Sequence, residues 1–316
     1  MDLKTERVKV LILGTGPAGL TCAIYAARFN LNPIVYEGHR PGGQLTTTSI
    51  VENFPGFPDG ILGAELIENM KKQSIKYGAE IRYGIATKVD FTGPIHKVWI
   101  DDGNLIETPV VVIATGATAK YLGLPSEEKY IGKGVSACAT CDGLFYKNKT
   151  VAVIGGGDSA CEEATYLSNI CKKVYMIVRR NEMRASKILQ QRVLSNPKIE
   201  IIFEHQPKEI IGDNNIVTGL VIIDKNNNEK ILNLDGIFVA IGHKPNTEIF
   251  KPFLEIDENG YILTKPNSTQ TNVPGVFACG DVQDKFYKQA VVAAGSGCMA
   301  AIEAEKYLQT LKLENF

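Results

Sequence analysis

Short apolar runs that end in glycine recur along the chain. The first, residues 10–13, is followed by Gly14, Gly16 and Gly19, then by a helical pattern and a second apolar run that ends at Glu37. A strand, G-x-G-x-x-G and a helix form the fingerprint of a dinucleotide-binding unit. In it the first glycine permits a tight turn, the second admits a pyrophosphate, the third lets helix and strand pack, and the acid accepts hydrogen bonds from a ribose. We therefore predict a dinucleotide site near the N-terminus.

The same pattern occurs a second time from residue 150 onward. Gly155, Gly157 and Ala160 take the places of the three glycines, and the position of the acid is occupied by a valine that Arg179 and Arg180 follow. Guanidinium groups bind phosphate in a bidentate manner, so two arginines at this place favour the 2′-phosphate of NADPH over the free ribose of NADH. The alternative is that both arginines are ordinary solvated surface charges.

Two further apolar strands, at residues 110–117 and 236–243, each lie about one nucleotide-binding domain downstream of a glycine motif. The spacing predicts an α/β fold with two Rossmann-like domains, the second inserted into the first. We expect the first domain to comprise residues 1–118 and 247–316, and the second to comprise residues 119–246.

Composition and charge narrow the classes of partner. The 316 residues are 44% hydrophobic, with 34 Lys and Arg against 35 Asp and Glu. Because the charges nearly cancel, we expect neither a nucleic acid nor a membrane surface as partner. The first residues are charged, and no segment approaches the roughly 20 apolar residues of a membrane span. We therefore expect a cytoplasmic protein.

The segment CATCDG, residues 138–143, contains two of the seven cysteines. It could be half of a zinc site, a structural staple or a disulfide that opens and closes. Zinc would need a second pair of ligands at close spacing, and neither the other cysteines nor the four histidines provide one. A bridge across so short a loop restricts the unfolded chain little. We therefore predict a reversible redox dithiol and no metal.

These motifs together resemble the low-molecular-weight, bacterial-type thioredoxin reductases, which are NADPH- and FAD-dependent flavoprotein disulfide reductases. The resemblance covers essentially the whole chain, in the segments GTGPAGL, PGGQLTTTSIVENFPGF, ATGATA, CATCDG, GGGDSA, VRRNEMRA, AIGHKPNT and GVFACGDVQDKFYKQAVVAAGSGCMAA. It implies the two-domain fold of that family, FAD on the first domain, NADPH on the second, thioredoxin as partner and a homodimer.

The resemblance also assigns binding residues. For FAD it implies Gly14, Gly16, Pro17, Ala18, Gly19, Glu37, Gly38, Gly42, Gly43, Gln44, Leu45, Asn53, Thr115, Gly116, Gly280, Asp281, Val282, Lys288, Gln289 and Ala290. For NADPH it implies Gly157, Asp158, Ser159, Ala160, Arg179, Arg180 and Arg184. Two residues depart from the family: Lys288 stands where arginine is frequent, and Val178 where histidine is frequent. Lysine keeps the charge of arginine but lacks its fork.

The resemblance gives each member of the redox pair a role. Cys141 would face the flavin, Cys138 would attack thioredoxin, and Asp142 would carry the proton as a general acid and base. The alternative for Asp142 is an Asx turn or helix cap. Two other functions stay open: a related NADPH-flavin reductase for another redox protein, and a non-catalytic redox sensor.

Overall fold

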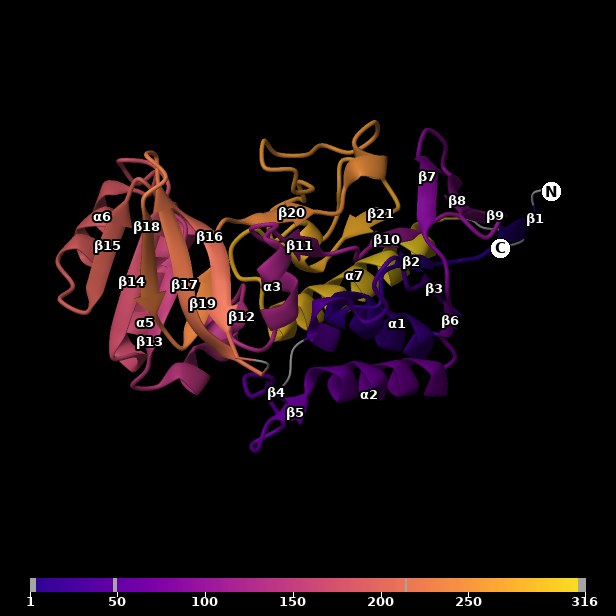
Figure 1. Cartoon of the computed structure of the whole chain (residues 1–316). Helices are drawn as coiled ribbons and strands as arrows, with labels where there is room; N and C mark the ends of the chain where they lie inside the picture. Colours follow the sequence, from indigo (N-terminus) through magenta and orange to yellow (C-terminus); the bar gives the residue numbers. More distant parts are fainter. Residues whose placement is uncertain (1–3, 48–49, 214, 312–316) are drawn as a thin grey trace. The chain divides into compact units, whose positions relative to one another are not determined.

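The structure is a computed structural model that describes residues 4–47, 50–213 and 215–311. The chain divides into two compact units. The first runs to Thr118 and resumes at Lys244, and the second consists of residues 119–243. In Figure 1 the first unit therefore carries the indigo and yellow ends of the colour scale, and the second carries the colours between them.

The first unit is built on a parallel sheet with the strand order β21-β10-β2-β3-β6. The strands are β2 (Leu11–Leu13), β3 (Ile34–Tyr36), β6 (Glu80–Arg82), β10 (Val111–Ile113) and β21 (Val276–Ala278). Strand β10 pairs with β2 on one side and with β21 on the other, so the sheet includes a strand that follows the second unit in the sequence. Every residue of β2, β3, β10 and β21 is buried, as expected for a parallel sheet covered on both faces.

Helices cover one face of this sheet, and a second sheet lies in the same unit. The helices are α1 (Pro17–Arg28), α2 (Gly63–Lys76) and α7 (Ala290–Thr310), and α1 contacts both of the others (Figure 1). The second sheet has the order β1-β9-β8-β7, from β1 (Lys4–Arg7), β7 (Ala86–Asp90), β8 (His96–Ile100) and β9 (Asn104–Thr108). Strands β4 (Ile50–Val51) and β5 (Ile61–Leu62) form a small antiparallel pair. Helix α7 packs so closely on α1 that a Cβ at Gly297 would lie 2.0 Å from the Ala18 carbonyl oxygen, so no side chain fits there.

The second unit repeats the parallel sheet, in the order β12-β19-β13-β14-β15. Its strands are β12 (Val135–Ser136), β13 (Thr150–Ile154), β14 (Lys173–Val178), β15 (Ile199–Phe203) and β19 (Gly236–Val239). An antiparallel sheet, β16 (His205–Gly212), β17 (Val217–Asp224) and β18 (Glu229–Asn233), packs its buried side chains with those of β13 and β19 in one apolar cluster. The helices are α3 (Pro125–Tyr130), α4 (Ala139–Asp142), α5 (Asp158–Ile170) and α6 (Lys187–Leu194).

The two connections between the units pair with each other. Strand β11 (Ala117–Ala119) leads into the second unit, β20 (His243–Pro245) leads out of it, and the two form a two-stranded sheet. The remaining elements are the 3-10 helices η1 (Gly43–Thr47), η2 (Gly143–Tyr146), η3 (Glu248–Phe250) and η4 (Gly280–Val282). Within the described part of the chain, no helix is long and apolar enough to cross a membrane.

Candidate functional site

The glycine turn after β2 combines close packing with open space. Gly14 has a φ of +113°, and a Cβ there would lie 2.3 Å from the Ala114 carbonyl oxygen. A Cβ at Gly19 would lie 1.9 Å from the carbonyl oxygen of Gly14, so both positions exclude a side chain. A Cβ at Gly16, in contrast, would meet nothing within 4 Å.

This open space lies at the N-terminus of α1. The helix begins with Pro17, has no side-chain cap and has no acid in its first turn. The free N–H groups and the positive end of the helix dipole therefore suit an anion such as the pyrophosphate of FAD. Pro17, Ala18 and Gly19, all predicted to bind FAD, form this first turn. The residues present thus fit the cofactor.

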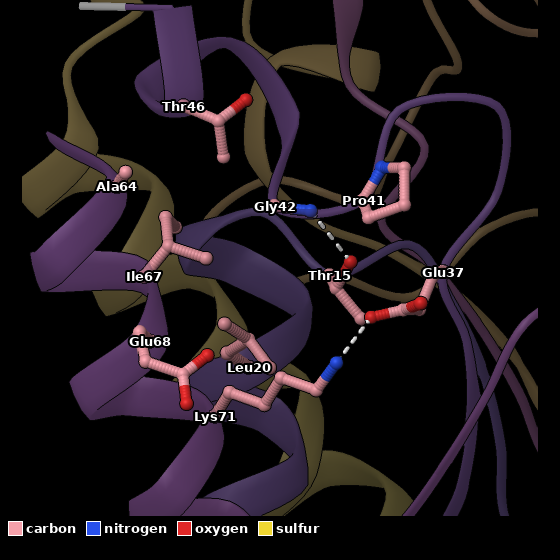
Figure 2. A pocket seen from close by; sticks show the side chains of 10 residues that line it. All are labelled: Thr15, Leu20, Glu37, Pro41, Gly42, Thr46, Ala64, Ile67, Glu68 and Lys71. Atoms are coloured by element: carbon pink, nitrogen blue, oxygen red, sulfur yellow. Dashed lines mark hydrogen bonds and ion pairs between the residues drawn. The ribbon is translucent and has the colours of Figure 1, made fainter.

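A cavity of about 170 Å³ adjoins the turn (Figure 2). Its walls are formed by Thr15, Leu20, Glu37, Pro41, Gly42, Thr46, Ala64, Ile67, Glu68 and Lys71. The N–H of Gly42 donates to Thr15 Oγ1 at 2.9 Å, and Lys71 Nζ lies 2.6 Å from Glu37 Oε1. Glu37, directly after β3, has a side chain only 11% exposed. The predicted ribose acceptor thus lies in a cavity wall beside the glycine turn.

The segment after Glu37 folds back against the glycine turn, where a Cβ at Gly43 would lie 3.4 Å from Gly16 Cα. Gly38, Gly42 and Gly43 all have positive φ, which glycine adopts without strain. Gln44, in η1, donates from Nε2 to the Ala117 carbonyl oxygen at 2.5 Å, and the next residue, Leu45, packs against an apolar cluster around α2. The loop is therefore held beside the end of β10, where other predicted FAD residues lie.

The end of β10 is held by a residue that the sequence did not single out. Asn246 donates from its N–H to the Gly116 carbonyl oxygen at 3.0 Å and from Nδ2 to the Thr115 carbonyl oxygen at 2.8 Å. Thr115 Oγ1 in turn donates to the Asn246 carbonyl oxygen at 2.8 Å. The two segments are 131 positions apart, so no local pattern could have revealed this contact.

The last group of predicted FAD residues follows β21. Gly280 begins η4 and donates from its N–H to Ser296 Oγ on α7 at 2.9 Å. Burial raises the pKa of Asp281 to about 6; the charge of Asp284 adds to this shift and that of Lys288 opposes it. Val282, which ends η4, is fully buried.

The N-terminus of α7 contacts a loop of the same unit. Gln289 caps α7, which begins at Ala290, and its Oε1 accepts a hydrogen bond from Asn53 Nδ2 at 3.2 Å. Lys288 lies just before the cap, with a φ of +46°. The structure thus brings Asn53 to Gln289, two residues that the family resemblance assigns to one cofactor.

The second glycine turn repeats the first within the other unit. Gly155 has a φ of +148°, and a Cβ there would lie 2.4 Å from the Ala240 carbonyl oxygen. Gly157 caps α5, and a Cβ there would meet nothing within 4 Å. Asp158, Ser159 and Ala160 form the first turn of α5. Gly157 therefore leaves room for a pyrophosphate, which fits the predicted dinucleotide, but unlike α1 this helix has an acid, Asp158, in its first turn.

The predicted phosphate-binding arginines lie beyond this turn. Strand β14 pairs in parallel with β13, so Arg179 and Arg180, exposed just after β14, follow the same sheet edge as the glycines. The N–H of Arg184 donates to the Gly156 carbonyl oxygen at 2.7 Å, which returns the loop to the glycine turn. Asp158 Oδ1 accepts a hydrogen bond from the Ser186 N–H at 2.7 Å and so helps to hold this loop.

Cys138 and Cys141 form a disulfide with a Cα–Cα distance of 5.3 Å. The peptide N–H of Cys138 donates to Ser136 Oγ at 3.0 Å, and the carbonyl oxygen of Cys138 accepts from the Asp142 N–H at 3.2 Å. Burial raises the pKa of the Asp142 carboxyl, and a hydrogen bond with Ser136 partly opposes that rise. Asp142 thus follows the disulfide directly and holds its proton to a higher pH than an exposed aspartate.

Two apolar residues that the sequence analysis did not single out follow the disulfide. Leu144 is 57% exposed and Phe145 is 40% exposed, both in η2. Exposed apolar side chains beside a reactive group are typical of a docking surface for another protein. In the sequence they are only two apolar residues after CATCDG, and nothing there distinguishes exposed apolar residues from buried ones.

The remaining sulfur and acidic groups give no metal centre in the part of the chain that is described: no set of three or more His, Cys, Asp or Glu is placed to hold an ion. Cys22, Cys161, Cys171 and Cys279 are free and buried. Burial raises the pKa of the Cys161 and Cys171 thiols to about 11, which keeps them protonated.

Comparison with known proteins places the chain among disulfide oxidoreductases. Residues 8–297 match the pyridine nucleotide-disulphide oxidoreductase family. The thioredoxin reductase of Eremothecium gossypii is 50% identical over 315 residues, covering 96% of this chain and 99% of its own. That of Rickettsia bellii is 52% identical over 303 residues, covering 95% and 98%. The solved thioredoxin reductase from Giardia duodenalis has a TM-score of 0.92 at 43% identity, covering 96% and 100%. The predicted fold class is confirmed.

Proposed function

The chain belongs to the pyridine nucleotide-disulphide oxidoreductase family, and from this premise we propose that its Cys138–Cys141 disulfide passes electrons from NADPH, by way of FAD, to oxidised thioredoxin. The predicted activity is confirmed: it is that of a thioredoxin reductase, an enzyme that uses FAD and NADPH. These relatives favour neither a non-catalytic sensor nor another redox protein as acceptor. The observation that carries the proposed route is the disulfide itself, on the unit with the second glycine turn.

The proposed FAD site lies on the first unit. The open N-terminus of α1 binds the pyrophosphate, and Glu37 accepts hydrogen bonds from the adenosine ribose. The loop around Gln44 and the segment at Asp281 hold the rest of the cofactor. When bound, FAD accepts a hydride from NADPH and delivers the two electrons to a disulfide.

The proposed NADPH site lies on the second unit. The N-terminus of α5 binds the pyrophosphate, and Gly157 leaves room for the approach. Arg179 and Arg180 pair with the 2′-phosphate, and Arg184 is kept near by its hydrogen bond to the glycine turn.

The exchange chemistry proceeds through two sulfur–sulfur bonds. The Cys138 thiolate attacks the disulfide of thioredoxin, which forms a mixed disulfide and releases one thioredoxin thiolate. The Cys141 thiolate then attacks Cys138 Sγ, which re-forms the Cys138–Cys141 bond and releases the second thioredoxin thiolate. Asp142, whose pKa burial raises, donates a proton to a departing thiolate and takes one up when the pair is next reduced.

We further propose that thioredoxin docks on Leu144 and Phe145, since these exposed side chains follow the disulfide within one turn. Replacing both with serine should raise the KM for thioredoxin while the NADPH half-reaction is unaffected. An unchanged KM would exclude this docking surface.

Two further properties are proposals. We propose a homodimer because α1, the residue that caps its end and α7 expose the apolar side chains of Tyr25, Phe29, Val292 and Met299. Sedimentation equilibrium would show a single species of twice the chain mass, and a monomer at micromolar concentration would contradict it. We place the enzyme in the cytoplasm, a reducing compartment, because its buried cysteines outside the CxxC pair are free thiols.

The decisive experiment separates the two cysteines. Cys141→Ser should accumulate a covalent complex with oxidised thioredoxin because no second thiol resolves the mixed disulfide, whereas Cys138→Ser should form none. Both variants should keep FAD, which a structural staple would not predict. A non-reducing gel reads the complex. A complex with Cys138→Ser alone would reverse the roles, and loss of FAD by both variants would reject the relay.

A further inference from the structure

An ion pair between α2 and the end of β3 lies in the wall of the cavity beside α1. Lys71, on α2, points its side chain toward Glu37 at the end of β3 (Figure 2). Lys71 Nζ lies 2.6 Å from Glu37 Oε1, and the two side chains are 33% and 11% exposed. The residues are 34 positions apart, so the pair exists only because α2 packs on α1.

Glu37 needs such a partner for two physical reasons. A carboxylate with so little access to water is unfavourable unless it is paired or hydrogen-bonded. The N-terminus of α1, which follows the adjacent strand β2 on the same sheet edge, is open to a pyrophosphate, whose negative charges would repel the carboxylate. A lysine ammonium opposes both effects. It still leaves the carboxylate free to accept hydrogen bonds from a ribose, because the two carboxylate oxygens together offer about four acceptor positions.

We propose that Lys71 is a positioning residue for FAD: it holds the Glu37 carboxylate toward the adenosine ribose and offsets the repulsion between that carboxylate and the pyrophosphate. The inference rests on the proposed FAD site. Lys71 acts through Glu37 and does not itself contact the cofactor.

The next residue on α2 is a matched control. Lys72 has the same charge and length, but its side chain is 69% exposed and pairs with Glu68 on its own helix at 3.5 Å. Exposed ion pairs of this kind contribute little to the stability of a protein. A lysine-to-methionine change at the two positions therefore alters net charge equally. At position 71 it removes the contact with Glu37, and at position 72 it removes only an exposed contact with Glu68, another residue of the cavity wall.

The test measures FAD binding to the flavin-free protein by quenching of flavin fluorescence. Lys71→Met should weaken FAD binding about 10-fold, Lys71→Arg should stay within about twofold of the unaltered chain, and Lys72→Met should have no effect. Trp99 fluorescence during urea unfolding shows that each variant is folded, and Lys71→Gln replaces the methionine variant if that one is not. Equal affinity of the Lys71 and Lys72 variants would overturn the proposal.

A double-mutant cycle with Glu37→Gln tests whether Lys71 acts through Glu37. In the glutamine background, Lys71→Met should change FAD affinity by less than about twofold, because the partner charge is already gone. A full 10-fold loss in that background would mean a direct contact with FAD and would reject the positioning role.

The outcome is separable from that of the proposed function. If the unaltered holoenzyme does not reduce thioredoxin with NADPH, the proposed electron route fails whatever Lys71 does. If it does reduce thioredoxin, and the Lys71→Met and Lys72→Met variants bind FAD with equal affinity, only the inference about Lys71 fails.

Discussion

Relative to the parent chain, the Asp281→Asn variant of the flavin-free protein should have a higher free energy of unfolding at pH 8 than it has at pH 5. The pKa of this carboxyl rises from its usual 3.8 to about 6, first through burial, then through the charge of Asp284, with Lys288 opposing. The folded state therefore binds the proton more tightly than the unfolded state. The stability that the proton provides is present at low pH and is lost as pH rises through about 6.

The size of the effect follows from the shift. Between pH 5 and pH 8 the parent chain should lose about 1.4 kcal/mol of unfolding free energy from this group, one pKa unit's worth. Water that reaches the partly exposed carboxyl reduces this figure. Asparagine does not titrate, so the variant does not lose this contribution. Between pH 5 and pH 8, the free energy of unfolding of Asp281→Asn should therefore rise relative to that of the parent by up to that amount.

Trp99, the single tryptophan of the chain, makes the measurement specific. It lies on β8 in the same unit as Asp281, so its fluorescence during urea unfolding reports on that unit. Unfolding of both proteins is measured at pH 5 and pH 8. A stability difference that does not change with pH, or that favours asparagine at pH 5, would refute the electrostatic reasoning.

Three further changes have distinct outcomes. Replacing Arg179 and Arg180 together by alanine should raise the KM for NADPH far more than that for NADH, since only NADPH carries the 2′-phosphate; equal losses would reject this role. Gly19→Ala should yield protein without FAD, because the new Cβ would lie 1.9 Å from the Gly14 carbonyl oxygen; a normal flavin absorbance ratio would contradict that clash. Asp142→Asn should slow thioredoxin reduction and flatten its pH profile. Since burial raises this pKa, the parent rate should fall as pH rises through it, and an unchanged profile in the variant would exclude Asp142 as the proton donor.

Several site residues could not be found from sequence. Asn246 contacts Thr115 across 131 positions, and Lys71, on α2, contacts Glu37 at the end of β3. Asn246 lies in the segment AIGHKPNT, but nothing in that segment names its partner, and Lys71 forms part of no motif. Such contacts depend on which helix packs where, which local patterns do not specify.

Exposure was equally beyond the sequence. Leu144 and Phe145 are apolar residues in a short 3-10 helix, where the helical period is too brief to define an inner and an outer face. Only the packed structure shows that both reach solvent beside the disulfide.

The sequence by itself determined the two nucleotide-binding folds and the redox pair. A Cβ at Gly19 would lie 1.9 Å from the carbonyl oxygen of Gly14, five positions away, and the cysteines of CATCDG are three positions apart. Both the glycine turn and the redox pair are therefore short-range patterns that can be read along the chain. The tertiary structure decided what surrounds them: the partner of Glu37 and the burial that raises the pKa of Asp142 and Asp281. The physical reason is range. The spacing of a motif is a short-range property, whereas desolvation, ion pairing and the close approach of Ala114 to Gly14 depend on every segment that packs against a group, however far away it lies in sequence.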